Sequence, residues 1–367
     1  MSENRACSEM PLVSVVMPTY CARTDVANAV ESVLAQTYPH WELLVINDFG
    51  SDDGTAEIVE AYHRKDTRVR LIQASRRLGL AESLNYGFRE AQGKYIARLD
   101  ADDTAHPTRF EKQVALMEAQ EDVGICGTWQ HHYGPDVEWI HRAESDEKKL
   151  ICNLLFWCDL CHSTLMLRRS VILDHQLYYD GDYAAEDYEL WTRAALVTRI
   201  VNIPEVLGEY KIDGTNITAA KEKEMKIDSG RITSKMLRNT LQMTLTPRQE
   251  YLISGWTNQY WDKRYPESRN RAESLTELKE VLLAIWSSNQ KKAFFAPESL
   301  LQTLSAKWHW ARDDGDCRTI YQVRSIEEAL ADKRGISIWE RYRIFRRNNP
   351  KFTMRLRKIL HRFFPTE

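Results

Sequence analysis

The chain has 367 residues, of which 43% are hydrophobic and 28% are charged, and its formal net charge at pH 7 is −3. This length predicts one large domain with an appendage, or two domains, with enough apolar residues to fill a sizeable core. The sequence contains no run of about 18 uncharged apolar residues and no apolar stretch near Met1, so it indicates neither a membrane-spanning helix nor an export signal. We therefore expect a cytoplasmic protein whose seven cysteines are reduced thiols.

The first half of the chain alternates short apolar runs with amphipathic segments. The predicted strands are Val13–Met17, Leu43–Ile46, Val69–Ile72, Tyr95–Leu99 and Val123–Cys126. The predicted helices are Val26–Leu34, Thr55–Arg64, Ala81–Ala91 and Arg109–Glu118. Such alternation predicts an α/β fold with a mostly parallel sheet, helices on both faces and right-handed crossovers. Ligands of such sheets bind beyond the carboxyl ends of the strands.

The rest of the chain has a different pattern. The polar and aromatic stretch from Trp129 to Lys148 is interpreted as a loop region over the site. A strand is expected at Ser163–Leu167 and a helix at Tyr188–Arg193, and beyond Ala220 the pattern is helical. We therefore divide the chain into an α/β domain at residues 11–218, a helical extension at 219–332 and a tail at 333–367.

The tail is strongly basic. It contains eleven Lys and Arg against two acidic residues, a net charge of +9, which leaves −12 for the remainder. Its apolar residues fall on one helical face: Phe352, Leu356, Ile359, Leu360, Phe363 and Phe364. This pattern favours a helix on an anionic membrane surface, which would place the protein on the inner face of the cytoplasmic membrane. A packed core helix is the alternative, and nucleic-acid binding is not expected.

Three carboxylates follow one predicted strand at once. Asp100, Asp102 and Asp103 come directly after Tyr95–Leu99. Clustered acids at the end of a buried strand repel one another unless a cation offsets their charge. A hard divalent metal shared with phosphates is one answer. The alternative is an acidic turn that caps the helix beginning near Pro107.

Several further motifs occur in a definite order around this cluster. They are Pro18-Thr19-Tyr20, Asp48-Phe49-Gly50-Ser51, Leu78-Gly79-Leu80, Asp100-Ala101-Asp102-Asp103 and Glu186-Asp187. In this order and spacing the chain resembles the inverting glycosyltransferases of family 2 over residues 11 to 218. The resemblance implies a GT-A fold, which is Rossmann-like, with a C-terminal helical extension. It also implies transfer of a sugar from a nucleotide-diphosphate sugar to a hydroxyl of a glycan or lipid-linked glycan, in polysaccharide biosynthesis of the cell envelope.

The resemblance assigns roles to the acidic residues. Asp102 matches the metal ligand, for Mn²⁺ or Mg²⁺, and Asp100 matches the residue that contacts the ribose or the metal through water. Asp103 fits either this site or a helix cap. Asp187 matches the general base, with Glu186 beside it to raise its pKa. The alternative for the last two acids is stabilisation of a helix N-terminus, and Trp191 in this motif suits packing better than sugar stacking.

The same resemblance places the donor around the first two strands. Pro18, Thr19 and Tyr20 match donor-binding positions, and Asp48 matches the acid that contacts the nucleobase; a capped turn is its alternative role. The pattern departs at Phe49, where the family usually has a second acid.

Other departures follow along the chain. Cys21 stands where the family commonly has Asn, and Arg77 stands where Asn often precedes the Leu-Gly-Leu run. Arg77 is expected to face the diphosphate as a fixed cation. Lys211 is a candidate phosphate contact, and Asp213 replaces a family His, where it is a candidate metal ligand.

The segment Cys158-Asp-Leu-Cys161-His162 matches the spacing of c-type haem attachment, and Cys152 lies nearby. Haem attachment requires export, and the cysteines fall short of the four ligands of a structural zinc site. Core packing is therefore the favoured interpretation. The family resemblance also places His162 near the acceptor side.

Two other functions remain as rivals. A sugar nucleotidyltransferase shares the parallel sheet, but it requires a Gly- and Lys-rich phosphate loop near the N-terminus, and residues 17–25 contain no Gly. A catalytically silent nucleotide-sugar-binding protein is suggested by the departures at Cys21, Phe49, Arg77 and Asp213.

Overall fold

The computed structural model describes residues 10–135, 137–213, 221–254, 271–313 and 325–330. The chain divides into two compact units. Residues 1–133, 139–150 and 158–211 belong to the first, and residues 134–138, 151–157 and 212–367 to the second. The basic tail at 333–367 lies outside the described residues, so its amphipathic helix stays a prediction.

A nine-stranded sheet, counted over the described residues, forms the first unit in the order β3-β2-β1-β4-β8-β6-β9-β5, with β7 paired to β6. The strands are β1 Val13–Thr19, β2 Trp41–Asn47, β3 Val69–Gln73, β4 Tyr95–Arg98, β5 Thr104–Ala105, β6 Val123–Gly134, β7 Val137–His141, β8 Met166–Arg168 and β9 Arg199–Lys211. The half from β3 to β4 is parallel throughout. Beyond it β8 runs antiparallel to both β4 and β6, so the whole sheet is mixed.

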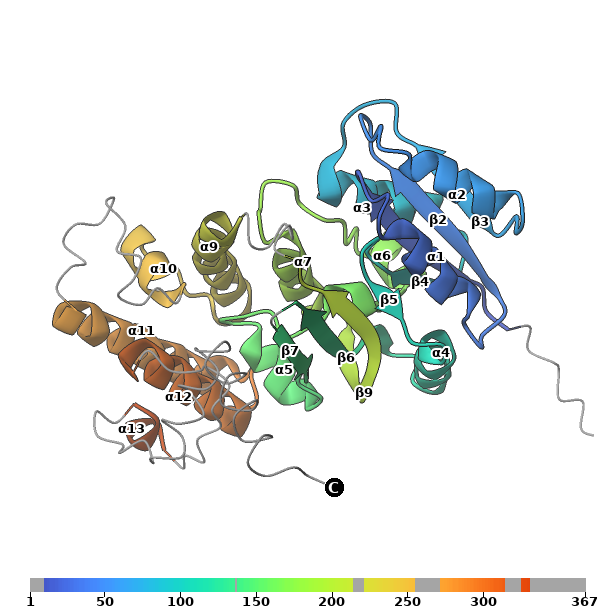
Figure 1. Cartoon of the computed structure of the whole chain (residues 1–367). Helices are drawn as coiled ribbons and strands as arrows, with labels where there is room; N and C mark the ends of the chain where they lie inside the picture. The colour runs from blue at the N-terminus through green and yellow to red at the C-terminus, as the bar shows by residue number, and fades with distance from the viewer. Residues whose placement is uncertain (1–9, 136, 214–220, 255–270, 314–324, 331–367) are drawn as a thin grey trace, which may run out of the picture. The chain divides into compact units, whose positions relative to one another are not determined.

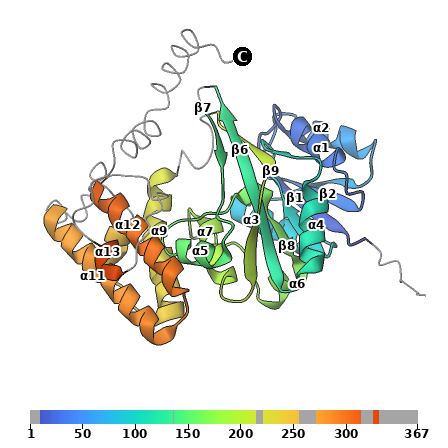
Figure 2. The same ribbon diagram turned by 90° about the horizontal axis from the view of Figure 1, so that it is seen from below.

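The helices of this unit are α1 Val26–Leu34, α2 Thr55–His63, α3 Gly79–Glu90, α4 Arg109–Ala119, α5 Glu147–Asn153, α6 Arg169–Asp174 and α7 Glu186–Ala194. The apolar periodicity predicts α1 to α4 and α7, whereas it does not predict α5 and α6. Figures 1 and 2 show the sheet with its helices from two directions. The predicted α/β fold is thus confirmed, and the boundaries of the first four helices lie within two residues of those predicted.

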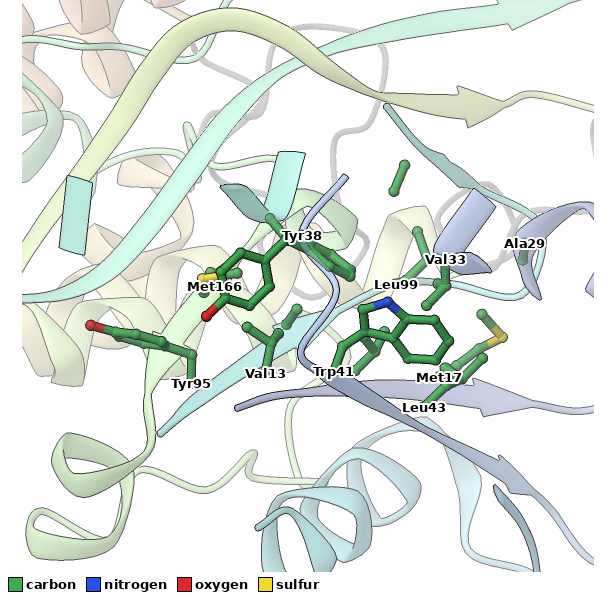
Figure 3. Close-up of a cluster of buried hydrophobic side chains, with 14 of the residues drawn as sticks. Val13, Met17, Ala29, Val33, Tyr38, Trp41, Leu43, Tyr95, Leu99 and Met166 are labelled. Atoms are coloured by element: carbon green, nitrogen blue, oxygen red, sulfur yellow. The ribbon is translucent and has the colours of Figure 1, made fainter. Parts of the chain in front are cut away.

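Alternate residues of the central strands pack against different helices. Val13, Val15 and Met17 of β1 lie in one core cluster with residues of α1 and α4. Figure 3 shows Met17 in this cluster with Trp41, Leu43, Val33 and Leu99. On β1 the alternating residue Val16 lies against α3, where a Cβ atom added at Gly87 would come within 2.3 Å of Val16 Cγ1. Gly87 therefore lets α3 approach the sheet closely.

The prediction of a loop from Trp129 to Lys148 is wrong. The strand β6 continues to Gly134, and the strand β7 follows at Val137–His141. Pairing with β9 supplies the hydrogen-bond partners, with Gln130 opposite Gly208 and Tyr133 opposite Lys211. The polar side chains on this stretch are compatible with a strand because its outer part is only half-buried. The expected strand at Ser163–Leu167 is also shifted, since a 3₁₀ turn at His162–Thr164 precedes β8.

The second unit is helical, as the pattern beyond Ala220 predicts. Its helices are α9 Glu222–Leu241, α10 Pro247–Ile253, α11 Arg271–Lys292, α12 Pro297–Asp313 and α13 Ile326–Ala329. The helix α10 begins with a capping box, in which the Thr246 side chain accepts from Gln249 N and the Gln249 side chain from Thr246 N. Among the described residues, no helix combines the length and the apolar character that crossing a membrane requires.

Candidate active site

The three predicted acids at the end of β4 lie together. Carboxylate oxygens of Asp100, Asp102 and Asp103 lie within 4.8 Å of one another. The chain then turns into β5, which pairs with β9, and Lys211 N donates to Asp103 Oδ1 at 3.3 Å. Oxygen ligands at this spacing fit a hard divalent cation such as Mg²⁺ or Mn²⁺.

A buried arginine on β4 faces this cluster. The guanidinium of Arg98, only 2% exposed, forms a two-pronged ion pair with both carboxylate oxygens of Asp100. A second buried guanidinium, that of Arg109, donates to the carbonyl oxygens of Arg98 (2.8 Å), Ser163 (2.9 Å) and Leu165 (3.1 Å). It therefore holds the end of β4 against the neighbouring segment.

Sequence reasoning missed both of these arginines. The signal that was available is Arg98 itself, a cation within an apolar strand two positions before an acid. A buried charge requires a partner, so this position predicts an ion pair.

The charge of the cluster is not fully offset by Arg98. Burial and, to a smaller extent, the neighbouring Asp100 carboxylate together raise the pKa of the Asp102 carboxyl to about 6. Burial also raises the pKa of Asp103 well above its ordinary value, with Asp100 and Asp102 adding to the effect. The site therefore favours extra positive charge, which either protons or a metal ion can supply.

Asp187 lies in the first turn of α7. Its Oδ1 accepts from Tyr188 N at 2.7 Å, as a helix-stabilising acid does. Burial raises the pKa of Asp187, while the Tyr188 amide and Arg98 lower it and Asp100 raises it. The fold thus brings Asp187 into electrostatic reach of Arg98 and Asp100, almost ninety residues earlier in the chain.

Glu186 is half-buried at the first residue of α7. Burial raises the pKa of the Tyr179 hydroxyl well above its ordinary value, and the charges of Asp187 and Glu186 act in the same direction. Both acids of this motif therefore act on the same hydroxyl group.

Tyr179 belongs to an aromatic group beside these acids. Its hydroxyl lies 2.8 Å from His162 Nε2, and both rings contact the fully buried Trp191 edge-on at 6.0 Å. Burial lowers the pKa of His162 well below its ordinary value, and Arg98 lowers it too, so this imidazole is neutral at pH 7. The burial of Trp191 makes it a packing residue, as the sequence favoured.

The donor-binding residues expected on β1 and β2 lie at the carboxyl end of the same sheet. Pro18 and Thr19 are buried and Tyr20 is exposed. Thr19 Oγ1 donates to Asn47 Oδ1 at 2.9 Å and so ties the ends of β1 and β2 together.

Asp48 holds the loop before α3. Its carboxylate accepts from Phe49 N at 2.8 Å, from Leu78 N at 2.7 Å and from Gly79 N at 3.0 Å. Arg77 Nε lies 3.2 Å from Asp48 Oδ2. These contacts match a capped turn, which is the alternative to a nucleobase contact for Asp48.

Arg77 also covers Tyr20. The guanidinium carbon of Arg77 lies 3.4 Å from the centroid of the Tyr20 ring, a cation–π contact. Phe49 beside them is 54% exposed. Arg77 also donates to Phe49 O at 3.4 Å, so two of the residues at which this chain departs from the family pattern are exposed side by side near the end of β2.

Lys211 and Asp213 belong to different units. Lys211 Nζ lies 2.5 Å from Asp25 Oδ1, and Asp25 is close enough to raise the pKa of Asp102. Asp213 is exposed and falls in the second unit, outside the cluster of three acids. Its role as a metal ligand stays a prediction.

Comparison with known proteins identifies the family. Residues 14–176 match the model of glycosyl transferase family 2. The chain is 40% identical over 226 residues to the putative teichuronic acid biosynthesis glycosyltransferase TuaG of Bacillus subtilis (strain 168). This alignment covers 59% of this chain and 85% of TuaG. The chain belongs to glycosyl transferase family 2.

The chain is also similar to another curated glycosyltransferase and to a solved structure. It is 28% identical over 217 residues to WfgD of Escherichia coli, and this alignment covers 59% of this chain and 83% of WfgD. WfgD is named as a UDP-Glc:alpha-D-GlcNAc-diphosphoundecaprenol beta-1,3-glucosyltransferase. A crystal structure of Staphylococcus aureus TarS 1–349 in complex with UDP-GlcNAc aligns with a TM-score of 0.54 and 16% identity, over 82% of this chain and 87% of that one. This likeness supports the α/β fold with C-terminal helices. Family membership confirms the expected enzyme class and sets aside the nucleotidyltransferase.

Proposed function

We propose that this glycosyltransferase transfers a sugar, with inversion at the anomeric carbon, from a nucleotide-diphosphate sugar to a hydroxyl of a glycan or lipid-linked glycan. The observation that carries the proposal is that the buried Arg98 acts electrostatically on two acidic groups. One is the cluster Asp100, Asp102 and Asp103, whose charge suits a diphosphate-bound cation, and the other is Asp187, whose raised pKa suits a base.

Asp102 and Asp100 are the residues that would hold Mn²⁺ or Mg²⁺. Such an ion supplies positive charge to the diphosphate as it leaves. The raised pKa of Asp102 fits this role, because a bound cation removes the repulsion that burial and Asp100 create. Arg98 holds the Asp100 carboxylate in a fixed orientation, which limits the reorganisation needed when the donor binds.

Asp187 is the proposed general base. It takes the proton of the acceptor hydroxyl while that oxygen attacks the anomeric carbon from the side opposite the diphosphate. A carboxylate is an inefficient base at its ordinary pKa, and the burial of Asp187 corrects this. Glu186 adds negative charge nearby, and the neutral His162 fixes the Tyr179 hydroxyl at the edge of the same site.

The donor nucleotide is proposed to bind along the ends of β1 and β2. Pro18 and Thr19 form the floor of the proposed nucleotide site, and Tyr20 presents an exposed ring beside it. The Arg77 guanidinium is exposed and can turn toward a phosphate, and Lys211 is the second candidate phosphate contact. Asp48 acts mainly by holding the loop that carries Arg77.

The acceptor class is proposed from the relatives. One is named for teichuronic acid biosynthesis and another for transfer to a diphosphoundecaprenol-linked sugar. A lipid-linked acceptor agrees with the proposed membrane contact of the basic tail at 333–367. A chain truncated before Lys333 should lose binding to anionic vesicles at low salt yet still glycosylate short soluble acceptors. Equal vesicle binding by both forms would contradict the membrane role.

The function is tested by a donor screen followed by a transfer assay. Each nucleotide sugar is first examined for thermal stabilisation of the protein with Mn²⁺, and the donors that bind are then incubated in labelled form with membrane extract. Labelled glycan with inverted configuration supports the proposal. Donor binding without transfer or slow hydrolysis, across the whole panel, would favour the catalytically silent alternative.

A further inference from the structure

We propose that His132, His141 and Cys161 form a zinc site that is separate from the diphosphate site. One side-chain ligand atom from each of these residues lies within 4.8 Å of the other two. An imidazole–imidazole–thiol set is a typical donor set for Zn²⁺, whereas Mg²⁺ and Mn²⁺ prefer oxygen. The three residues belong to the same structural unit.

The fold brings the three residues together from distant positions. His132 lies on β6 and His141 ends β7, which pairs with β6. Cys161 directly precedes the 3₁₀ turn at His162–Thr164. On β6, Gln130 shares a face with His132 and donates to Ser163 Oγ at 2.7 Å, so this face of the strand meets the segment around Cys161.

The spacing is close to that of a tetrahedral zinc site. Zn–N and Zn–S bonds of about 2.0–2.3 Å put ligand atoms roughly 3.5 Å apart. The three ligand atoms, which lie within 4.8 Å of one another, therefore have to approach by at most about 1.3 Å. Cys161 is buried and His132 and His141 are half-buried, so the site is partly shielded from bulk solvent.

A carboxylate stands beside one of the ligands. Asp159 Oδ1 lies 3.4 Å from His141 Nε2, and the two side chains are only 9% and 13% exposed. With Nε2 facing Asp159, His141 would ligate zinc through Nδ1, and a carboxylate in this position orients a histidine ligand and raises its basicity. The rings of His132 and His141 also stack at 5.5 Å between centroids. Stacking alone accounts for the two rings, but it does not account for a buried thiol and a carboxylate beside them.

The position of the site indicates its role. Zinc would tie the β6–β7 strands to the segment that continues into His162, the partner of Tyr179. The next residue, Ser163, contacts Asp103 of the acidic cluster. The zinc is therefore expected to stabilise the acceptor side of the active site without touching the reacting atoms.

Cobalt spectroscopy tests the proposal on the full-length protein. Protein stripped of metal is titrated with Co²⁺, and a bound thiolate is expected to give a charge-transfer band in the near ultraviolet with the strong visible bands of tetrahedral cobalt. The bands should saturate at one ion per chain and disappear when Zn²⁺ is added. Asp102→Asn should keep the thiolate band, because the carboxylate site has no sulfur.

Matched variants identify the ligands. Cys161→Ser should abolish the charge-transfer band, while Cys158→Ser, three positions earlier, should keep it. Asp159→Asn should weaken cobalt binding by about 10–100-fold, as is usual for an orienting carboxylate. If Cys161→Ser fails to fold, His141→Gln tests the site in its place. Loss of one imidazole should weaken cobalt binding and shift the visible bands. A wild-type protein without a thiolate band, or an unchanged band in Cys161→Ser, would overturn the zinc site.

Discussion

The guanidinium of Arg98 pairs with both carboxylate oxygens of Asp100 at the end of β4. Arg98 also lowers the pKa of Asp102, Asp103 and Asp187 by its positive charge. One buried cation thus acts on the charge of both the proposed metal-binding acids and the proposed base, which links their titration.

Asp102→Asn tests the metal site. The change removes a negative ligand but keeps the shape, so affinity for a nucleoside diphosphate in Mn²⁺ should fall by at least about 10²-fold. The remaining affinity should be nearly insensitive to EDTA. Isothermal titration with and without chelator measures both effects, and Asp174→Asn, an exposed acid at the end of α6, is the control. Equal metal-dependent affinity in mutant and parent would remove Asp102 from the site.

The pH dependence of Mn²⁺ binding follows from the pKa of Asp102 near 6. Below this pH a proton occupies the carboxylate, so metal-dependent diphosphate affinity should fall about tenfold per pH unit. The stability of the metal-free protein depends on pH in the opposite direction. Because the folded pKa lies above the unfolded value of about 3.9, the metal-free protein gains stability from this group as pH falls from 7 to 4. Binding curves and melting temperatures from pH 4 to pH 8 should show both trends, and Asp102→Asn should flatten them.

Asp187→Asn tests the base. The amide oxygen can still accept from Tyr188 N, so folding and donor binding should be preserved. Transfer should fall by about 10²–10⁴-fold, the usual size of a general-base contribution. Turnover with a saturating donor is the measurement, and Glu186→Gln is expected to have a smaller effect. A collapsed melting transition in Asp187→Asn would instead show that its carboxylate is needed to start α7.

Asp48→Asn distinguishes a structural from a donor-binding role. The carboxylate accepts three backbone N–H groups and faces Arg77, and an amide cannot satisfy all of them. We expect the free energy of unfolding to fall by about 1.5–3 kcal/mol, measured by urea denaturation. Unchanged stability with weaker donor binding would support the nucleobase contact that the family resemblance implies.

Cys21→Asn should stabilise the protein. Cys21 has a φ of 52°, in the left-handed region, and its N–H donates to Ser51 Oγ at 3.0 Å. Most residues with a Cβ are strained there by about 1 kcal/mol, whereas Asn tolerates it. The unfolding free energy should therefore rise by a large part of that amount. Cys21→Ala removes the thiol but not the strain, so it should give no gain, and a gain there would trace the effect to the thiol.

Local pattern was sufficient for the parallel half of the sheet. The apolar runs at Val13–Met17 and Leu43–Ile46 are strands, and the polar groups after them meet at one edge of the sheet. The outer half of the sheet was harder to predict from the sequence. Trp129 to Tyr133 looks like a loop because its side chains are polar and aromatic, but β9, about eighty residues later, supplies its hydrogen bonds.

The sequence by itself determined the fold class, the family motifs and the three acids after β4, because these depend on hydrophobic periodicity and on residues adjacent in the chain. The tertiary structure decided that Arg98 forms an ion pair with Asp100 and lowers the pKa of Asp187. It also placed His132 and His141 beside Cys161, whereas the sequence favoured core packing for the cysteines and did not single out either histidine. The physical reason is the same in both cases. Electrostatic pairing and metal ligation act over a few ångströms in space, and no spacing along the chain encodes which strands and turns the sheet will bring that close.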